Sequence, residues 1–395
     1  MEFHDFNEEM EEFFFKSSLS SYFHKDNYEI LFSSTTDGEG KGVCEINGAE
    51  ISPDYQLKYK IHWHSSKKEK IDSIEFTMPN DEAKIGQIFS TMPYGLINKN
   101  RTGLGATTLE LSSRRNSIVV VPTRALAYEK AKNSRIDNTD KYKVLYYGGR
   151  IPGFTVPSVS EYLQDNEIPF KKFIVVIDSL PRLLEEIPET EQNNYFIMFD
   201  EIDSYQYDSH YRVNMESAFD YYFKYPPNKR CLVSATIGKF SNPLINQEPV
   251  INIKFNSTSQ RNITLQHTDN VIITTARLIE ETYRLHPGEK ILIALNWVTE
   301  GIMYIIESLP QELKEKCSVL CGDKNREDVG QYYKEILNTT LPSEITFMTC
   351  TYFVGIDINE RFHLISCCEV KRVFTLFIIP NNTPTDSQLV GVFLL

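Results

Sequence analysis

The sequence has little positive charge and no arginine in its first 100 residues. Its 395 residues carry 41 Lys and Arg against 54 Asp and Glu, a net charge of −13. This balance excludes a protein that binds nucleic acid by being basic over its whole surface. Residues 1–90 hold 18 acidic and 9 basic residues, so most of the negative charge lies there. A local basic groove in the remaining residues is still compatible with the composition.

Three further absences concern the cellular compartment. No apolar run approaches the roughly 20 residues that span a bilayer. The acidic residues 1–5 lack the basic and apolar regions of a secretory signal. The seven cysteines are an odd and scattered set, which favours a reducing compartment and buried thiols over disulfides or zinc ligands. We therefore expect a cytoplasmic protein without a membrane partner.

Residues 1–88 are expected to form an acidic accessory module. Residues 1–23 place apolar side chains at helical spacing. They indicate either a helix that packs on the rest of the chain or one that binds a protein partner. Residues 28–78 alternate apolar and polar side chains between turn signals, which is typical of a small β-rich or α+β module.

From about residue 85 the pattern changes to short apolar runs separated by polar helical stretches. Such runs predict a parallel sheet covered by helices on both faces. We expect two consecutive α/β units, residues 89–245 and 246–395, joined through a linker of Gly, Pro, Asn and Ser over 237–265. The predicted strands are 117–121, 143–147, 173–177, 195–199, 230–234, 290–295, 317–320, 345–349, 363–367 and 375–379.

A glycine-rich loop precedes a predicted helix in the first unit. Its sequence is Thr102-Gly103-Leu104-Gly105-Ala106-Thr107-Thr108. Such a loop directs backbone N–H groups and the positive end of a helix dipole at phosphates, and the Thr107 hydroxyl would lie where these loops bind Mg²⁺. The usual lysine is missing because Ala106 occupies its place. Taken alone, the loop is a weak indication of nucleotide binding.

Two further motifs follow the loop. Asp200-Glu201 comes directly after the apolar run 196–199, and Ser234-Ala235-Thr236 comes at the end of the next predicted strand. A carboxylate at a strand end can hold Mg²⁺ through water, and the next one can orient the attacking water. An Asp-Glu pair by itself is often only a solvated turn, so the order of the three motifs carries the argument.

In this order the motifs resemble those of superfamily 2 helicases, the DEAD/DEAH-box group. The similarity runs from about residue 95 to 391, with further motifs at 121–127, 291–296 and 349–357. It implies two tandem RecA-like parallel-sheet domains that bind ATP and Mg²⁺ and couple ATP hydrolysis to movement along nucleic acid or to unwinding. The implied partner is single-stranded or duplex nucleic acid, DNA more than RNA. The short, divergent chain resembles motors of phages and mobile elements.

The resemblance also implies roles for individual residues. Asp200, Glu201, Ser234 and Thr236 would be catalytic, and Asp200 and Thr107 would hold Mg²⁺. The residues implied to contact the nucleotide are Lys99, Arg101, Thr102, Gly103, Leu104, Gly105, Ala106, Thr107, Thr108, Gly355, Asp357 and Gln388. Those implied to contact nucleic acid are Pro122, Thr123, Arg124, Gly149, Arg182 and Thr351. A strand held mainly through its phosphates needs only a few well-placed cations, despite the net negative charge.

The sequence departs from the family at two places. Ala106 leaves the phosphates without their usual cation, and Arg101 or Lys99 would have to replace it unless both are solvent-facing charges. At the final motif Gln388 fits, but Val392 and Leu395 stand where two arginines belong. Such an arginine is worth about 10³–10⁵ in rate in related enzymes. The second RecA-like domain is therefore expected to be incomplete at its C-terminal end.

Three alternatives to an active motor stay open from the sequence. The protein could be a helicase-like nucleic-acid or nucleotide-binding protein with weak or no hydrolysis. It could be a truncated fragment of a motor, since truncation explains the missing arginines simply. A third hypothesis, a nucleotide-dependent scaffold for protein partners, depends only on the acidic residues 1–23.

Overall fold

The computed structural model divides into two compact units, Met1–Ser257 and Thr258–Leu395. It describes residues 30–394, except 37–41, 59–66, 72, 81, 135, 137–140, 152–153, 208–216, 236–239, 241, 256–262, 337–339, 353–357, 359 and 370–388. The predicted acidic helix over 1–23 and the predicted strand over 375–379 lie outside the described residues.

The first unit begins with a small antiparallel sheet in the order β3-β2-β1-β4. Its strands are β1 (Ile30–Thr36), β2 (Gly42–Ile46), β3 (Ala49–Glu50) and β4 (Lys67–Ile71), and helix α2 (Pro53–Lys58) follows β3. Buried side chains of β2, β3 and α2 join one core cluster of the larger sheet described next. This α+β module, which the alternating pattern of residues 28–78 predicted, is thus packed onto the first unit rather than separate from it.

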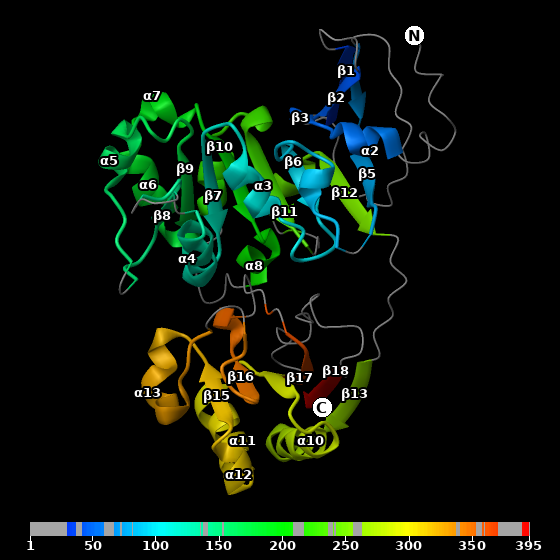
Figure 1. Ribbon diagram of the computed structural model, residues 1–395, viewed down its shortest axis with the longest axis vertical. Helices are drawn as coiled ribbons and strands as arrows, with labels where there is room; N and C mark the ends of the chain where they lie inside the picture. The colour runs from blue at the N-terminus through cyan, green and yellow to red at the C-terminus, as the bar shows by residue number, and fades with distance from the viewer. Residues whose placement is uncertain are drawn as a thin grey trace. The chain divides into compact units, whose positions relative to one another are not determined.

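An eight-stranded parallel sheet forms the body of the first unit, in the order β5-β12-β6-β11-β10-β7-β9-β8 (Figure 1). Side chains along each strand alternate between two core clusters: Val119 and Val121 of β7 face one, and Ile118 and Val120 face the other. This double burial explains why the strands are apolar throughout. The strands are β5 (Ser73–Met78), β6 (Gly95–Asn98), β7 (Ser117–Val121), β8 (Val144–Tyr147), β9 (Lys172–Val176), β10 (Phe196–Asp200), β11 (Arg230–Ser234) and β12 (Val250–Phe255).

Helices cover both faces of this sheet. On one face, α3 (Ala106–Ser112) and α4 (Arg124–Lys132) pack beside the small module. On the other face lie α5 (Val159–Gln164), α6 (Leu180–Glu186), α8 (Ile202–Tyr207) and α9 (Ala218–Tyr222). The short helix α7 (Glu189–Gln192) follows α6. The layered arrangement is the one that alternating strands and helices predicted.

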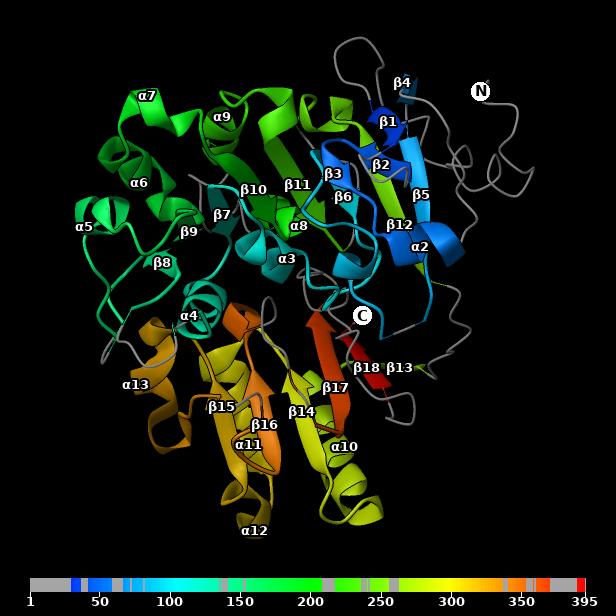
Figure 2. The same cartoon turned by 45° about the horizontal axis from the view of Figure 1, so that its top comes forward.

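The second unit is built on a six-stranded parallel sheet in the order β13-β18-β17-β14-β16-β15, whose strands lie side by side in Figure 2. Its strands are β13 (Ile263–Thr268), β14 (Lys290–Ala294), β15 (Cys317–Leu320), β16 (Ile345–Met348), β17 (Phe362–Glu369) and β18 (Leu389–Leu394). The helices α10 (Val271–Leu285), α11 (Met303–Ser308), α12 (Gln311–Lys314) and α13 (Arg326–Val329) contribute to one core cluster on this sheet. Among the described residues, no helix has both the length and the apolar character needed to cross a membrane.

The structure changes two predicted boundaries and one predicted linker. Strand β5 lies within the expected module 1–88 and β12 within the expected second unit 246–395, yet the two pair with each other in the first sheet. The predicted linker over 237–265 is wrong, because it contains β12 and the start of β13. The pairing joins residues far apart in sequence, so a local pattern could not reveal it. The division into three parts stays a prediction.

Candidate nucleotide site

The glycine-rich loop connects β6 to α3 and is fixed by contacts to a neighbouring segment. Gly103 and Gly105 have φ of 71° and 86°, in the left-handed region that glycine adopts easily. Lys84 Nζ donates to the Gly103 carbonyl at 2.6 Å, and the Ile85 N–H donates to the Leu104 carbonyl at 2.9 Å. Gly105 immediately precedes α3. The loop therefore has the strand, turn and helix order expected of a phosphate-binding loop.

Lys99 lies in a buried cluster with two carboxylates. Its Nζ is 3.1 Å from Asp200 Oδ1 and 2.8 Å from Glu201 Oε1, and Lys99 and Asp200 are each only 3% exposed. The Thr107 hydroxyl donates to Asp200 Oδ2, and the Lys99 N–H donates to the Ser234 carbonyl at 2.7 Å. Three sequence motifs thus meet at the carboxyl ends of β6, β10 and β11, which are neighbouring strands.

The environment of Lys99 keeps its ammonium group charged. Burial alone would lower its pKa, but the charges of Asp200 and Glu201 outweigh burial and raise the pKa above its usual value. Arg101, the other candidate cation, instead places its guanidinium carbon 5.1 Å from the centre of the Phe255 ring. Of the two residues the sequence left open, Lys99 is therefore the one beside the carboxylates.

Glu201 has a strained backbone and a perturbed carboxyl group. Its φ of 53° lies in the left-handed region, which costs free energy for a residue other than glycine and is often found at functional sites. Burial raises the pKa of Glu201 to about 7, the nearby Asp200 and Asp203 carboxylates add to this, and Lys99 opposes it. A carboxyl group with a pKa near neutrality suits proton transfer at physiological pH.

A hydrogen bond links two of the predicted motifs. Ser234 Oγ donates to Asp203 Oδ1 at 2.8 Å, so the end of β11 is tied to the first turn of α8. No role was predicted for Asp203 from the sequence. The only sequence feature that could have pointed to Asp203 is its position two residues after Glu201, which is a weak signal. Thr236, predicted beside Ser234, lies outside the described residues.

The predicted nucleic-acid contacts of the first unit follow the carboxyl ends of other strands of the same sheet. Thr123, two residues after the end of β7, caps α4 by accepting from the Leu126 N–H at 3.3 Å. Arg124 donates to the Arg150 carbonyl at 2.7 Å. A Cβ placed on Gly149 would meet the Arg124 guanidinium at 3.2 Å, so these two predicted residues are neighbours.

The remaining predicted residues are less closely connected. Pro122 is buried at the end of β7, and exposed Arg182 donates to Ser179 Oγ at 3.3 Å from α6, which follows β9. Thr351 is exposed in the second unit. Within the loop, Thr102 and Thr108 are exposed, whereas Leu104 and Ala106 are buried. Gly355, Asp357 and Gln388 lie outside the described residues.

The donor atoms of the cluster fit a magnesium ion. Carboxylate and hydroxyl oxygens are the protein ligands that Mg²⁺ prefers, usually one or two of them together with phosphate and water. Asp200 and Thr107 supply such oxygens in direct contact with each other. The ammonium of Lys99 already occupies a cation position against the same carboxylate.

Comparisons with known proteins identify the fold. No protein-family model and no curated protein matches the chain. The solved structure of Mss116p bound to ssRNA and AMP-PNP matches with a TM-score of 0.51 and 15% identity, over 78% of this chain and 67% of that one. The S. cerevisiae Dbp5 bound to RNA and ADP BeF3 matches with a TM-score of 0.50 and 11% identity, over 77% of this chain and 79% of that one. The fold is that of two tandem RecA-like domains. Identities this low show the fold alone.

Proposed function

We propose that this protein is an ATP-dependent nucleic-acid motor of the helicase type, with Lys99 as the cation of its ATP site. The observation that carries the proposal is the buried contact of Lys99 with Asp200 and Glu201 beside the Thr107 hydroxyl. A cation, two carboxylates and a hydroxyl at the end of a phosphate-type loop are the parts that phosphoryl transfer requires.

The residues of the cluster would divide the work of hydrolysis. Asp200 and Thr107 would hold Mg²⁺, which neutralises charge on the phosphates. Glu201 would accept the proton of the attacking water, for which a pKa of about 7 is suitable. Lys99 would exchange its contact with the carboxylates for one with the phosphates, in place of the lysine that Ala106 replaces. Ser234, bonded to Asp203, would couple this cluster to β11.

The neighbouring strands support a nucleic-acid site beside the ATP site. The strand order β6-β11-β10-β7-β9-β8 places the residues of the proposed ATP site and the predicted nucleic-acid contacts on different stretches of one edge of the sheet, the edge formed by the carboxyl ends of the strands. Residues of the proposed ATP site follow β6, β10 and β11, whereas Thr123, Gly149 and Arg182 follow β7, β8 and β9. The proposed partner is single-stranded or duplex nucleic acid, with DNA preferred over RNA. A protein partner of residues 1–23 stays a prediction.

The test is ATP turnover with and without single-stranded DNA or RNA. We expect Lys99→Ala to lower turnover by about 10²–10³-fold, the usual cost of losing a group that stabilises transition-state charge. Arg101→Ala tests the rival cation, and Lys132→Ala, an exposed lysine of α4, is the matched control. Turnover in Lys99→Ala equal to that in Lys132→Ala would contradict the assignment. Comparing the stimulation of ATP turnover by single-stranded DNA and by RNA in one assay tests which nucleic acid the protein prefers.

A second candidate function is nucleotide and nucleic-acid binding with little hydrolysis. It is favoured by Ala106 and by β18, where Val392, at a position the family gives to arginine, pairs with Gln266 on one side and Cys367 on the other. Measuring ATP affinity and turnover in the same preparation separates the two functions. Firm binding with turnover no higher than that of Glu201→Gln would favour the binding protein.

A further inference from the structure

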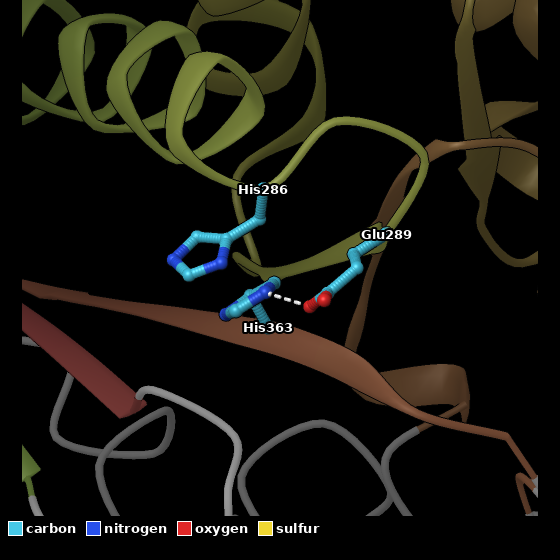
Figure 3. Close-up of side chains that lie close together, drawn as sticks. All are labelled: His286, Glu289 and His363. Carbon is cyan, nitrogen blue, oxygen red and sulfur yellow. Dashed lines mark hydrogen bonds and ion pairs between the residues drawn. The ribbon is translucent and has the colours of Figure 1, made fainter.

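Three side chains able to bind a metal lie together in the second unit, apart from the proposed ATP site. His286 follows α10, Glu289 precedes β14, and His363 is the second residue of β17. One ligand atom from each lies within 4.8 Å of the others. Figure 3 shows the three side chains converging from the turn between α10 and β14 and from the adjacent strand.

His363 has an incomplete set of polar partners. It is 4% exposed, its Nε2 lies 2.6 Å from Glu289 Oε2, and its ring centre lies 4.3 Å from that of His286. Within the described part of the chain, its buried Nδ1 has no hydrogen-bond partner. Buried polar atoms are normally paired, and two imidazoles packed against one carboxylate are an arrangement that a cation would stabilise.

The donor set indicates the class of metal. Two imidazole nitrogens and one carboxylate oxygen suit zinc and other late first-row divalent ions, with a fourth position left for water. Magnesium and calcium prefer sites made of oxygen alone. Tetrahedral zinc with bonds of about 2.0–2.2 Å needs ligand atoms roughly 3.3–3.5 Å apart. The contact between His363 and Glu289 would therefore have to open slightly, and the Glu289 side chain, 57% exposed on a turn, can rotate to allow it.

The site lies at the opposite end of its strands from where nucleotides bind. His363 and Glu289 are at the amino ends of β17 and β14, whereas ligands of open parallel sheets bind beyond the carboxyl ends. We propose that His286, Glu289 and His363 bind one zinc ion, which ties the turn after α10 to strand β17. This proposal does not depend on the function proposed above.

Zinc binding to the 395-residue chain tests the proposal directly. The protein is stripped with a chelator, dialysed and titrated with Zn²⁺ alone, and bound zinc is counted by elemental analysis. We expect one zinc per chain and a melting temperature that rises with zinc concentration by mass action. Co²⁺ in the same site should give the absorption spectrum of a tetrahedral ion.

The variants are chosen so that folding does not obscure the result. Glu289→Gln and His286→Ala alter side chains that are not fully buried, and each should weaken zinc affinity at least tenfold. His267→Ala, an exposed histidine of β13, is the matched control and should bind as the parent does. A parent chain that takes up no zinc would overturn the proposal. So would Glu289→Gln and His286→Ala variants that bind zinc as tightly as His267→Ala.

Discussion

Among the residues whose burial the structure describes, the first unit has two buried lysines, at opposite edges of the same sheet, and their surroundings differ. Lys99, at the carboxyl edge, donates to oxygens of two carboxylates. Lys172, at the amino edge, donates to the Glu110 carbonyl at 2.7 Å and to the Ser113 and Ser117 hydroxyls at 2.8 Å each. All three N–H groups of Lys172 are thus used by neutral oxygens, with the Glu110 carboxylate 3.8 Å away.

The pKa values follow this difference. Burial lowers the pKa of Lys172 to about 8, and Glu110 only partly offsets it. The two carboxylates instead raise the pKa of Lys99. A lysine held by neutral hydrogen bonds in a closed network stabilises the fold, since any exchange would leave buried polar atoms unpaired. A lysine held by anions can exchange them for another anion, such as a phosphate. The comparison therefore supports a structural role for Lys172 and is consistent with the functional role proposed for Lys99.

The largest expected effect comes from Glu201→Gln, which keeps the shape of the side chain and removes its ability to accept a proton. Turnover of ATP should fall by about 10²–10⁴-fold, the usual contribution of a general base. The amide retains an oxygen that can accept from Lys99, so ATP binding should persist. Steady-state hydrolysis and equilibrium binding measure the two quantities, with Glu189→Gln on exposed α7 as the control. Unchanged ATP turnover in Glu201→Gln would show that Glu201 is not the general base.

Replacing each buried lysine by methionine tests the comparison itself. Lys99→Met should lower turnover by about 10²–10³-fold. Lys172→Met should lower the free energy of unfolding by about 1–3 kcal/mol, because it leaves buried oxygens without a donor, while turnover of the folded protein is kept. Urea titration and ATP hydrolysis below the melting temperature separate the two effects. Loss of ATP turnover in a folded Lys172→Met chain would contradict the distinction between the roles of the two lysines.

The sequence predicted many of the strands because buried parallel strands are apolar along their length, but β6, β12, β13 and β18 were not predicted. The run 117–121 coincides with β7 and the run 230–234 with β11. Strand β5 lies within the alternating residues 28–78 that predicted a β-rich module, but its place in the large sheet was not predicted, because its partner β12 is distant in sequence. Local patterns report burial, but they do not report which distant strand completes a sheet.

The candidate site was predicted as a set of motifs, but its geometry was not. Lys99 and Arg101 flank Asn100, whose φ of 51° turns the chain between them. Spacing alone left Lys99 and Arg101 as alternatives, whereas the folded chain places Lys99 among the carboxylates. The group of His286 and His363 was equally hidden, since its members meet only when β17 pairs with β14.

The pH dependence of turnover should report the charge state of Glu201. The base is active when deprotonated, and its pKa is raised by burial to about 7, so turnover should rise about tenfold between pH 6 and pH 8. Asp203 contributes to the raised pKa as a like charge. Asp203→Asn should therefore move the midpoint of the profile to lower pH. A flat profile over this range would show that a different group limits the rate.

The smallest expected effect comes from Ser234→Ala, which removes the 2.8 Å hydrogen bond to Asp203. The loss should cost about 0.5–1.5 kcal/mol, and the proposed catalytic groups around Lys99 should stay in place. We therefore expect basal turnover close to that of the parent but weaker stimulation by single-stranded nucleic acid, because the bond joins the carboxylate motif to β11. Titrating the nucleic acid against ATP turnover measures this stimulation, with exposed Ser160→Ala in α5 as the control. Equal stimulation in both variants would mean that the bond only holds α8 against the sheet, and the proposed functional role would then be confined to the groups that contact Lys99.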